Sequence, residues 1–136
     1  MAYERQVYSL SSFLLFSLFL SACAFTSGGE EEKKEAFDLA RTCFQTLLES
    51  KSMEPDVSSF TNFFLVISRH LKPGPIRDQF AEAIFHEGCK RGKIGKQVLD
   101  NFRRASPSVA SRVLSEHRVL PTEWKNKIKH DGYKSL

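Results

Sequence analysis

The chain has 136 residues, of which 41% are hydrophobic and 26% charged, and its formal net charge is +4. This length and balance fit one soluble globular domain. The three cysteines, Cys23, Cys43 and Cys89, are far apart and form no C-x-x-C motif. This spacing excludes a disulfide framework and gives no sign of zinc binding or thiol redox chemistry.

The charge is distributed unevenly along the chain. Residues 1–68 carry 5 Lys/Arg and 9 Asp/Glu, a net charge of −4, whereas residues 69–136 carry 15 and 7, a net charge of +8. The basic half can attract a polyanion such as RNA or an anionic membrane. A basic surface that is merely solvated is the alternative.

The first 25 residues predict a hydrophobic leader. No charged residue occurs from Val7 to Phe25, and the apolar centre Phe13–Leu20 follows a weak basic region at Arg5. Ala22-Cys23-Ala24 forms an A-x-A signal, so we expect cleavage between Ala24 and Phe25. A retained anchor is the alternative, because the uncharged run approaches the length needed to span a bilayer.

Two resemblances compete for this segment. Ala22–Thr26 (Ala-Cys-Ala-Phe-Thr) resembles the alanine–phenylalanine cleavage motif of diatom and related algal plastid preproteins. Leu20–Cys23 resembles a bacterial lipobox, which implies lipidation of Cys23. The acidic segment Gly28–Glu32 departs from plastid transit peptides, which are poor in acids. The leader predicts entry into the secretory route towards a secondary plastid, with secretion or membrane anchoring as the alternative.

The body of the chain predicts helices in succession. Apolar residues recur every three or four positions from Lys34 to Ser50, which predicts an amphipathic helix that ends before Pro55. Ser58 or Ser59 is expected to cap a second helix. This helix is apolar on most sides, so we expect it to be buried between its neighbours.

Further helices follow a turn at Lys72–Pro75. Pro75 suits the first position of a third helix that ends near Gly88 or Gly92, and a short fourth helix follows. Ser106 is expected to cap a fifth helix, and Thr122 a last short one. No stretch shows strand alternation. The prediction is an all-α fold of short antiparallel helix pairs.

Proline-containing turns between short helices suggest a helical repeat. Pro55–Phe64 (Pro-Asp-Val-Ser-Ser-Phe-Thr-Asn-Phe-Phe) resembles the boundary between two pentatricopeptide repeats, where Pro-Asp closes one repeat and Val opens the next. Arg77–Gly92 together with Leu120–Trp124 is similar to the C-terminal end of pentatricopeptide-repeat proteins of diatoms and other algae. The resemblance covers roughly residues 35–128.

The resemblance implies an α-solenoid that binds single-stranded RNA in plastids or mitochondria, reading one base per repeat. It gives Thr61 the fifth position of its repeat, which contacts the base edge, and Asp56 the last position of the repeat before. Ser58 takes the second position, where the family has a larger apolar residue that sandwiches the base. Ser58 therefore implies weak stacking.

The repeat pattern is short. The first helix of the first repeat is missing or displaced by the leader, and beyond Leu71 the spacing leaves the repeat length. About one and a half repeats remain, whereas a solenoid needs about three units. We therefore expect RNA binding by this chain alone to be weak and non-specific. The predicted organisation is a leader at 1–24, an acidic linker at 25–34, a helical-repeat domain at 35–130 and a tail at 131–136.

Chemistry-bearing residues are few. The basic pairs Lys90-Arg91 and Arg103-Arg104 are candidates for phosphate contacts. His86 and Cys89 lie three residues apart, but two ligands alone do not make a metal site. No nucleotide-binding or hydrolase motif occurs, so we predict a non-catalytic protein without metal or cofactor.

Two functions remain open from the sequence. One is single-stranded RNA binding in organellar RNA metabolism. The other is a helical protein–protein adaptor, secreted or tethered to a membrane, with transient membrane contact through the leader. The placement of the basic residues on the helix layers distinguishes the two.

Overall fold

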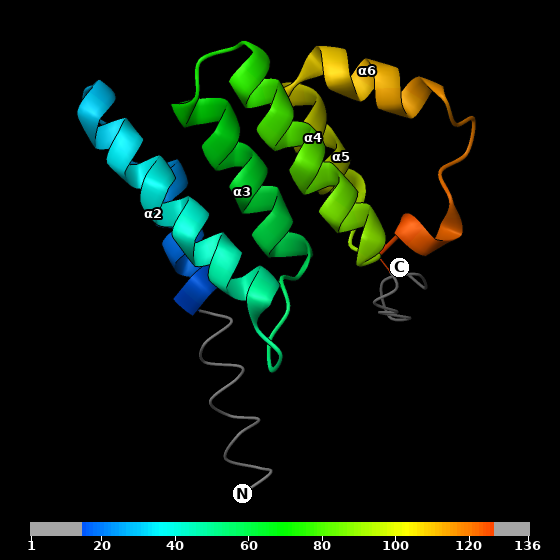
Figure 1. The fold of residues 1–136 in the computed structure, drawn as a ribbon, viewed down its shortest axis with the longest axis horizontal. Helices are drawn as coiled ribbons and strands as arrows, with labels where there is room; N and C mark the ends of the chain where they lie inside the picture. Colours follow the sequence, from blue (N-terminus) through cyan, green and yellow to red (C-terminus); the bar gives the residue numbers. More distant parts are fainter. Residues whose placement is uncertain (1–14, 127–136) are drawn as a thin grey trace, which may run out of the picture.

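The computed structural model describes residues 15–126, and these residues fold into helices (Figure 1). A helix over residues 15–24, here the N-terminal helix, precedes α2 (Glu30–Glu49), α3 (Val57–His70), α4 (Pro75–Lys90), α5 (Lys96–Ala105), α6 (Pro107–Ser115) and the 3-10 helix η1 (Thr122–Trp124). Within this range the sole β contact is an isolated bridge between Ile94 and Lys125. The predicted all-α fold is confirmed. The tail at 131–136 and the leader before residue 15 lie outside the described residues.

The helices form antiparallel pairs in two layers. The N-terminal helix, α3 and α5 form one layer, in which α3 packs along α5 and hydrogen-bonds to the N-terminal helix. Helices α2, α4 and α6 form the other layer. The stacking of helix pairs agrees with the predicted helical-repeat module. The last pair departs from it, because α6 runs sideways from the upper ends of α4 and α5 instead of along them (Figure 1).

Helix α2 begins four residues earlier than expected, at Glu30. Its first turn holds Glu30, Glu31 and Glu32. Acidic side chains at a helix N-terminus interact favourably with the helix dipole, so the acidic stretch can form the first turn of α2. Residues 30–34, half of the segment that we expected to be a linker, are therefore helical.

Three predicted caps need correction. Asp56, and not Ser58 or Ser59, caps α3: its carboxylate accepts hydrogen bonds from the backbone N–H and the hydroxyl of Ser59, both at 2.8 Å. Ser106 stands at the expected cap of α6, but its hydroxyl donates to Asp78 at 2.6 Å. The last helix is a single 3-10 turn with Pro121, and not Thr122, at its cap position.

Helix α4 ends at Lys90, between the two glycines, Gly88 and Gly92, near which the sequence predicted its end. Gly92 has a φ of 66°, and the backbone N–H groups of Lys93 and Gly92 donate to the carbonyls of Gly88 and Cys89. This pair of bonds is a Schellman motif, which a left-handed residue completes. Gly88 lies inside the helix, where a Cβ would stand 2.9 Å from the side chain of Ile94. Gly88 thus permits a close approach, and Gly92 ends the helix.

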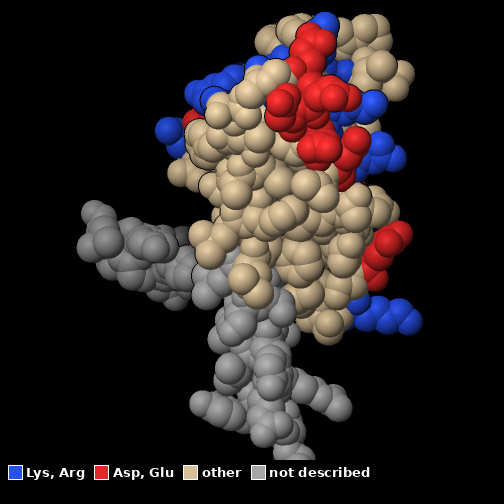
Figure 2. Space-filling model, turned by 90° about the vertical axis from the view of Figure 1, so that its left-hand side faces the viewer, with Lys and Arg blue, Asp and Glu red and all other residues tan. Residues whose placement is uncertain are grey.

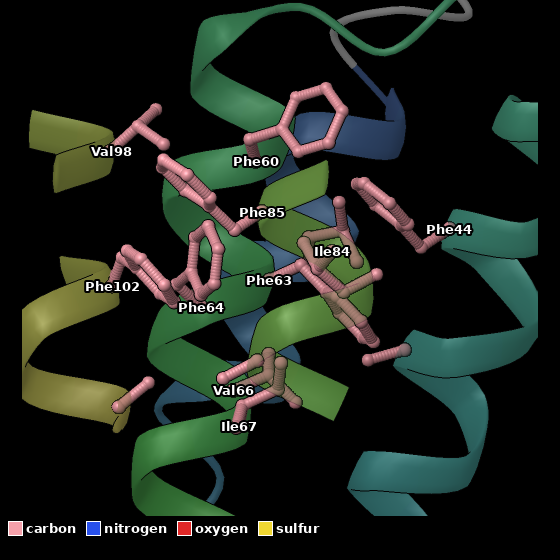
Figure 3. Packing of buried hydrophobic residues seen from close by; sticks show 14 of the residues in the cluster. Phe44, Phe60, Phe63, Phe64, Val66, Ile67, Ile84, Phe85, Val98 and Phe102 are labelled. Atoms are coloured by element: carbon pink, nitrogen blue, oxygen red, sulfur yellow. The ribbon is translucent and has the colours of Figure 1, made fainter. Parts of the chain in front are cut away.

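Phenylalanine rings from four helices fill the core (Figure 3). Phe44 of α2 stacks on Phe63 of α3 with centroids 4.7 Å apart, and Phe85 of α4 stacks on Phe102 of α5 at 4.1 Å. Phe64 lies 5.5 Å from Phe102 and is fully buried. The buried central helix that the sequence predicted is confirmed as α3.

The N-terminal helix belongs to this core. Leu20, Cys23 and Ala24 are buried with the side chains of α2 and α3. At its C-terminal end, Arg69 and the ring of His70 donate to the carbonyls of Ala24 and Cys23, both at 2.6 Å. The last carbonyls of a helix lack partners within the helix, so these two side chains cap it. The described part of the predicted leader is thus a helix that packs into the core.

Candidate nucleic-acid interface

The three base-contacting candidates do not share an exposed surface. The hydroxyl of Thr61 is buried without a hydrogen-bond partner, and its carbonyl accepts from the side chain of Asn101 on α5. The carboxylate of Asp56 is occupied as the cap of α3. Ser58 is exposed and shares a hydrogen bond with Ser17 of the N-terminal helix. Ser58 alone of the three is available to a base.

The two phosphate-contacting pairs lie at opposite ends of the α4–α5 hairpin. Lys90 is the last residue of α4 and Arg91 its C-cap, whereas Arg103 and Arg104 lie at the C-terminal end of α5. Ten residues of α-helix separate the ends of α5 by about 15 Å. Arg91 is further held by Glu87 and by the carbonyl of Leu48, both at 3.0 Å.

Arg77 organises the end that holds Arg103 and Arg104. Its guanidinium donates to the carbonyl of Leu71 after α3, at 3.1 Å, and to those of Ala105 and Arg104 in α5, at 2.7 and 3.3 Å. The C-terminal ends of α3 and α5 therefore meet at the first turn of α4. We call the cations gathered there the basic edge, which consists of Arg69, Lys72, Arg77, Arg103 and Arg104.

The basic edge is only partly neutralised. Lys72 pairs with Glu30 at 3.1 Å, and Arg103 approaches Asp100 at 3.6 Å, but both pairs are exposed and therefore weak. Arg69 lies over the ring of Phe25, with 5.1 Å from its guanidinium carbon to the centroid. Arg104 has no acidic partner among residues 15–126. This edge can still attract an anion.

Across the described basic half, the basic edge included, most cations are compensated. Residues 69–126 hold 12 Lys/Arg and 6 Asp/Glu, a net charge of +6. Seven of these cations lie within 4 Å of a described acidic side chain. Formal net charge thus overstates the attraction that a polyanion would feel.

Sequence reasoning missed Arg69, Lys72 and Arg77 as members of a site. They are distant from Arg103 in the chain, and no local cluster marks them. One signal was available: α3 and α5 each carry basic residues in the last turn. Helices that run parallel in one layer bring their last turns to the same edge.

Among the described residues, the buried thiols are held protonated and the histidines form no metal-ligating group. Burial raises the pKa of the Cys89 thiol to about 12, and burial together with nearby Cys23 raises the pKa of the Cys43 thiol to about 11, so both stay protonated at neutral pH. His86 is exposed and lies 3.5 Å from Glu82, whereas Cys89 is buried. No group of three metal-ligating side chains occurs in the described range.

In the part of the chain that the structure describes, no helix is both long and apolar enough to cross a bilayer. Comparisons with known proteins add no relative: no family model, curated protein or solved structure matches the chain. The fold itself defines the class of protein, an all-α module of stacked helix pairs.

Proposed function

We propose that the chain is a non-catalytic helical-repeat module that binds single-stranded RNA weakly, through phosphate contacts at the basic edge. The observation that carries the proposal is the Arg77 bridge, which joins the end of α5 to the residue after α3. The other four cations of the basic edge lie in the last turns of α3 and α5 or in the turn after α3. Phosphate contacts from Arg and Lys supply sequence-independent affinity for nucleic acids. The organellar setting rests on the pentatricopeptide-repeat resemblance and is part of the proposal.

Little sequence preference is expected, because base reading needs side chains that reach the base edges. The hydroxyl of Thr61 is buried, and the carboxylate of Asp56 is engaged at the cap of α3. Ser58 is too small to serve as a stacking platform, and stacking on aromatic side chains accounts for much of single-strand affinity. Neutral hydrogen-bonding residues on the same layer, such as Asn62 and Asn101, are already bonded to neighbouring carbonyls.

A titration of labelled single-stranded RNA against salt tests the proposal. We expect binding at low salt that disappears as salt rises, with the same affinity for two unrelated sequences of equal length. Arg103→Gln together with Arg104→Gln removes two phosphate contacts. Each contact on a single strand adds about 0.7 to the slope of log K against log salt, so the slope should fall by about 1.4.

The matched control is Lys90→Gln together with Lys96→Gln, which removes the same charge from exposed side chains at the other end of the hairpin. The slope should then change little. Equal losses in both double variants would show that net charge, and not the basic edge, attracts the RNA. Tight binding that Thr61→Val abolishes would show instead that Thr61 reads a base.

A further inference from the structure

A groove lies where α2 begins, α3 ends and the following turn leads into α4. Its cavity volume of about 720 Å³ falls within the roughly 300–1,000 Å³ of pockets that hold small organic molecules. Figure 2 shows the side of the molecule that carries the N-terminal helix and α2, and its charged side chains gather towards the top, where α2 begins in Figure 1. The groove lies at this charged end of the molecule.

Three of the side chains that line the groove are large and apolar. Phe37 belongs to α2, Leu71 follows the last residue of α3, and Ile76 stands in the first turn of α4. Phe37 is buried, whereas Ile76 is 66% exposed. An apolar side chain this exposed contributes favourable free energy when a ligand covers it.

The polar groups beside these side chains are already bonded or out of reach. The hydroxyl of Ser68 donates to the carbonyl of Leu65 at 3.0 Å, and the Nε2 of His70 donates to the carbonyl of Cys23 at 2.6 Å. The Nδ1 of His70 is buried. A nucleobase would find few hydrogen-bond partners among these groups, and polar edges left unpaired cost binding free energy. The groove therefore suits a ligand with an apolar body.

Cations line the same groove. Five Lys/Arg and two Glu side chains contribute to it, a net charge of +3. Lys33 and Lys34 lie near the start of α2, and neither has an acidic side chain within 4 Å among residues 15–126. Lys72 pairs with Glu30 at 3.1 Å, but this pair is exposed and therefore weak. The groove thus attracts an anion.

We propose that the groove binds one molecule of a single-chain anionic amphiphile, of the fatty-acid class. Its alkyl chain covers Ile76 and the accessible parts of Phe37 and Leu71, and its carboxylate lies beside Lys33 and Lys34. An alkyl chain needs no hydrogen-bond partner and is stabilised by leaving water, whereas the carboxylate is attracted by the cations. The alkyl stems of the two lysines add apolar surface between chain and carboxylate. This proposal goes beyond RNA binding and does not rest on it.

Nuclear magnetic resonance of the full chain, titrated with dodecanoate below its micelle concentration, tests the proposal. Amide signals from the start of α2 and from the turn between α3 and α4 should shift together and saturate at one bound molecule, with a Kd on the order of 0.1–1 mM. Decanoate has fewer CH₂ groups, each worth a factor of about 4 when fully buried, so it should bind up to ~15-fold more weakly. Decanol, which has the chain length of decanoate without its charge, should bind more weakly still.

One pair of variants tests the apolar contact. Ile76→Gln removes apolar surface from the groove and should raise the Kd at least ~5-fold. The matched control is Leu18→Gln, because Leu18 is 67% exposed on the N-terminal helix and does not line the groove. It should leave the Kd unchanged, and circular dichroism shows whether each variant keeps its helices. Signals that shift mainly on the N-terminal helix, or a Kd that both variants raise equally, would overturn the proposal.

A second pair of variants tests the charge. Lys33→Gln together with Lys34→Gln should raise the Kd about 5-fold. Lys90→Gln together with Lys96→Gln removes the same charge from exposed side chains outside the groove and should leave the Kd unchanged. Equal effects of the two double variants would show that net charge, and not the groove, attracts the carboxylate, and the proposal would then be wrong.

Arg103→Gln together with Arg104→Gln separates this proposal from RNA binding. Neither side chain lines the groove, so the double variant should weaken RNA binding and leave the Kd for dodecanoate unchanged. A wild-type chain that gives no saturable shift with dodecanoate overturns the proposal, whether or not the chain binds RNA. Shifts around the groove that uridine monophosphate causes and dodecanoate does not would also overturn it, and would assign the groove to a nucleotide.

Discussion

At the C-terminal end of the stack, α6 turns Ser108, Ser111 and Arg112 to solvent, and Trp124 of η1 packs its ring against Phe85. At the N-terminal end, the exposed positions of the first helix are leucine, phenylalanine and alanine. The described C-terminal end therefore presents polar side chains to solvent, whereas the described part of the first helix presents apolar ones.

The comparison also bears on the predicted leader. An uncharged apolar run is typical of a signal peptide, and also of a helix packed on two sides. Composition does not distinguish a signal peptide from such a helix, whereas side-chain contacts with neighbouring helices do. Here Ser17 bonds to Ser58, and Arg69 and His70 cap the helix end. These contacts give residues 15–24 a structural role, whereas cleavage before Phe25 stays a prediction.

The largest expected effect comes from removing the N-terminal end. A chain that begins at Phe25 is the mature form that the leader interpretation predicts. It loses the buried Leu20, worth about 1.5–3 kcal/mol, and exposes a similar apolar area on α2 and α3. We expect the free energy of unfolding to fall by about 3–6 kcal/mol, measured by urea denaturation. Unchanged stability would show that the fold does not need this helix and would favour cleavage.

A somewhat smaller loss of unfolding free energy is expected for a substitution in α3, the helix in the middle of the stack. Phe64 is fully buried against Phe102, so Phe64→Ala leaves a cavity between α3 and α5. The free energy of unfolding should fall by about 3–5 kcal/mol. Leu39→Ala, at an exposed position, is the control and should change it by less than about 0.5 kcal/mol. A loss below about 1 kcal/mol for Phe64→Ala would mean that α3 is peripheral.

The sequence predicted what local patterns determine. The spacing of Phe60, Phe63 and Phe64 indicated a buried helix, and Pro75 marked where α4 begins. Its end was placed near Gly88 or Gly92, and it ends between them, at Lys90. Caps were less predictable, because Asp56, Ser58 and Ser59 are all good cap residues and only the backbone geometry selects one. The start of α2 was missed because a run of acidic residues suits both a linker and the first turn of a helix.

The site was less predictable than the fold. The basic edge depends on Arg77, whose three carbonyl partners lie 6 to 28 residues away in the chain. No local pattern reveals such a bridge. Thr61 likewise lies beside α5, where the side chain of Asn101 donates to its carbonyl, and the repeat pattern did not cover this helix. The family resemblance assigned base-contacting roles from positions along the chain. Whether those side chains are accessible to a base depends on how the helices pack.

The smallest effect is expected at the C-terminal end, where one ion pair fastens α6 to α4. Arg112 donates to Glu82 at 2.6 Å, and this hydrogen bond lowers the pKa of the Glu82 carboxyl below its ordinary value of 4.5. A lowered pKa means that the fold favours the carboxylate, so the stabilisation is present above pH 4.5 and is lost as the pH falls through the lowered pKa. Exposed pairs contribute about 0.2–1 kcal/mol, so Arg112→Gln should lower the Tm only slightly at neutral pH. The difference between the Tm of Arg112→Gln and that of the wild type should shrink towards zero as the pH falls below 4.5. The control is Arg118→Gln, because the Arg118 side chain has no acidic partner in the described range, and its Tm difference should not change with pH in this way. A difference in Tm that stays constant into acid would show that Arg112 acts through the packing of its aliphatic stem and not through Glu82.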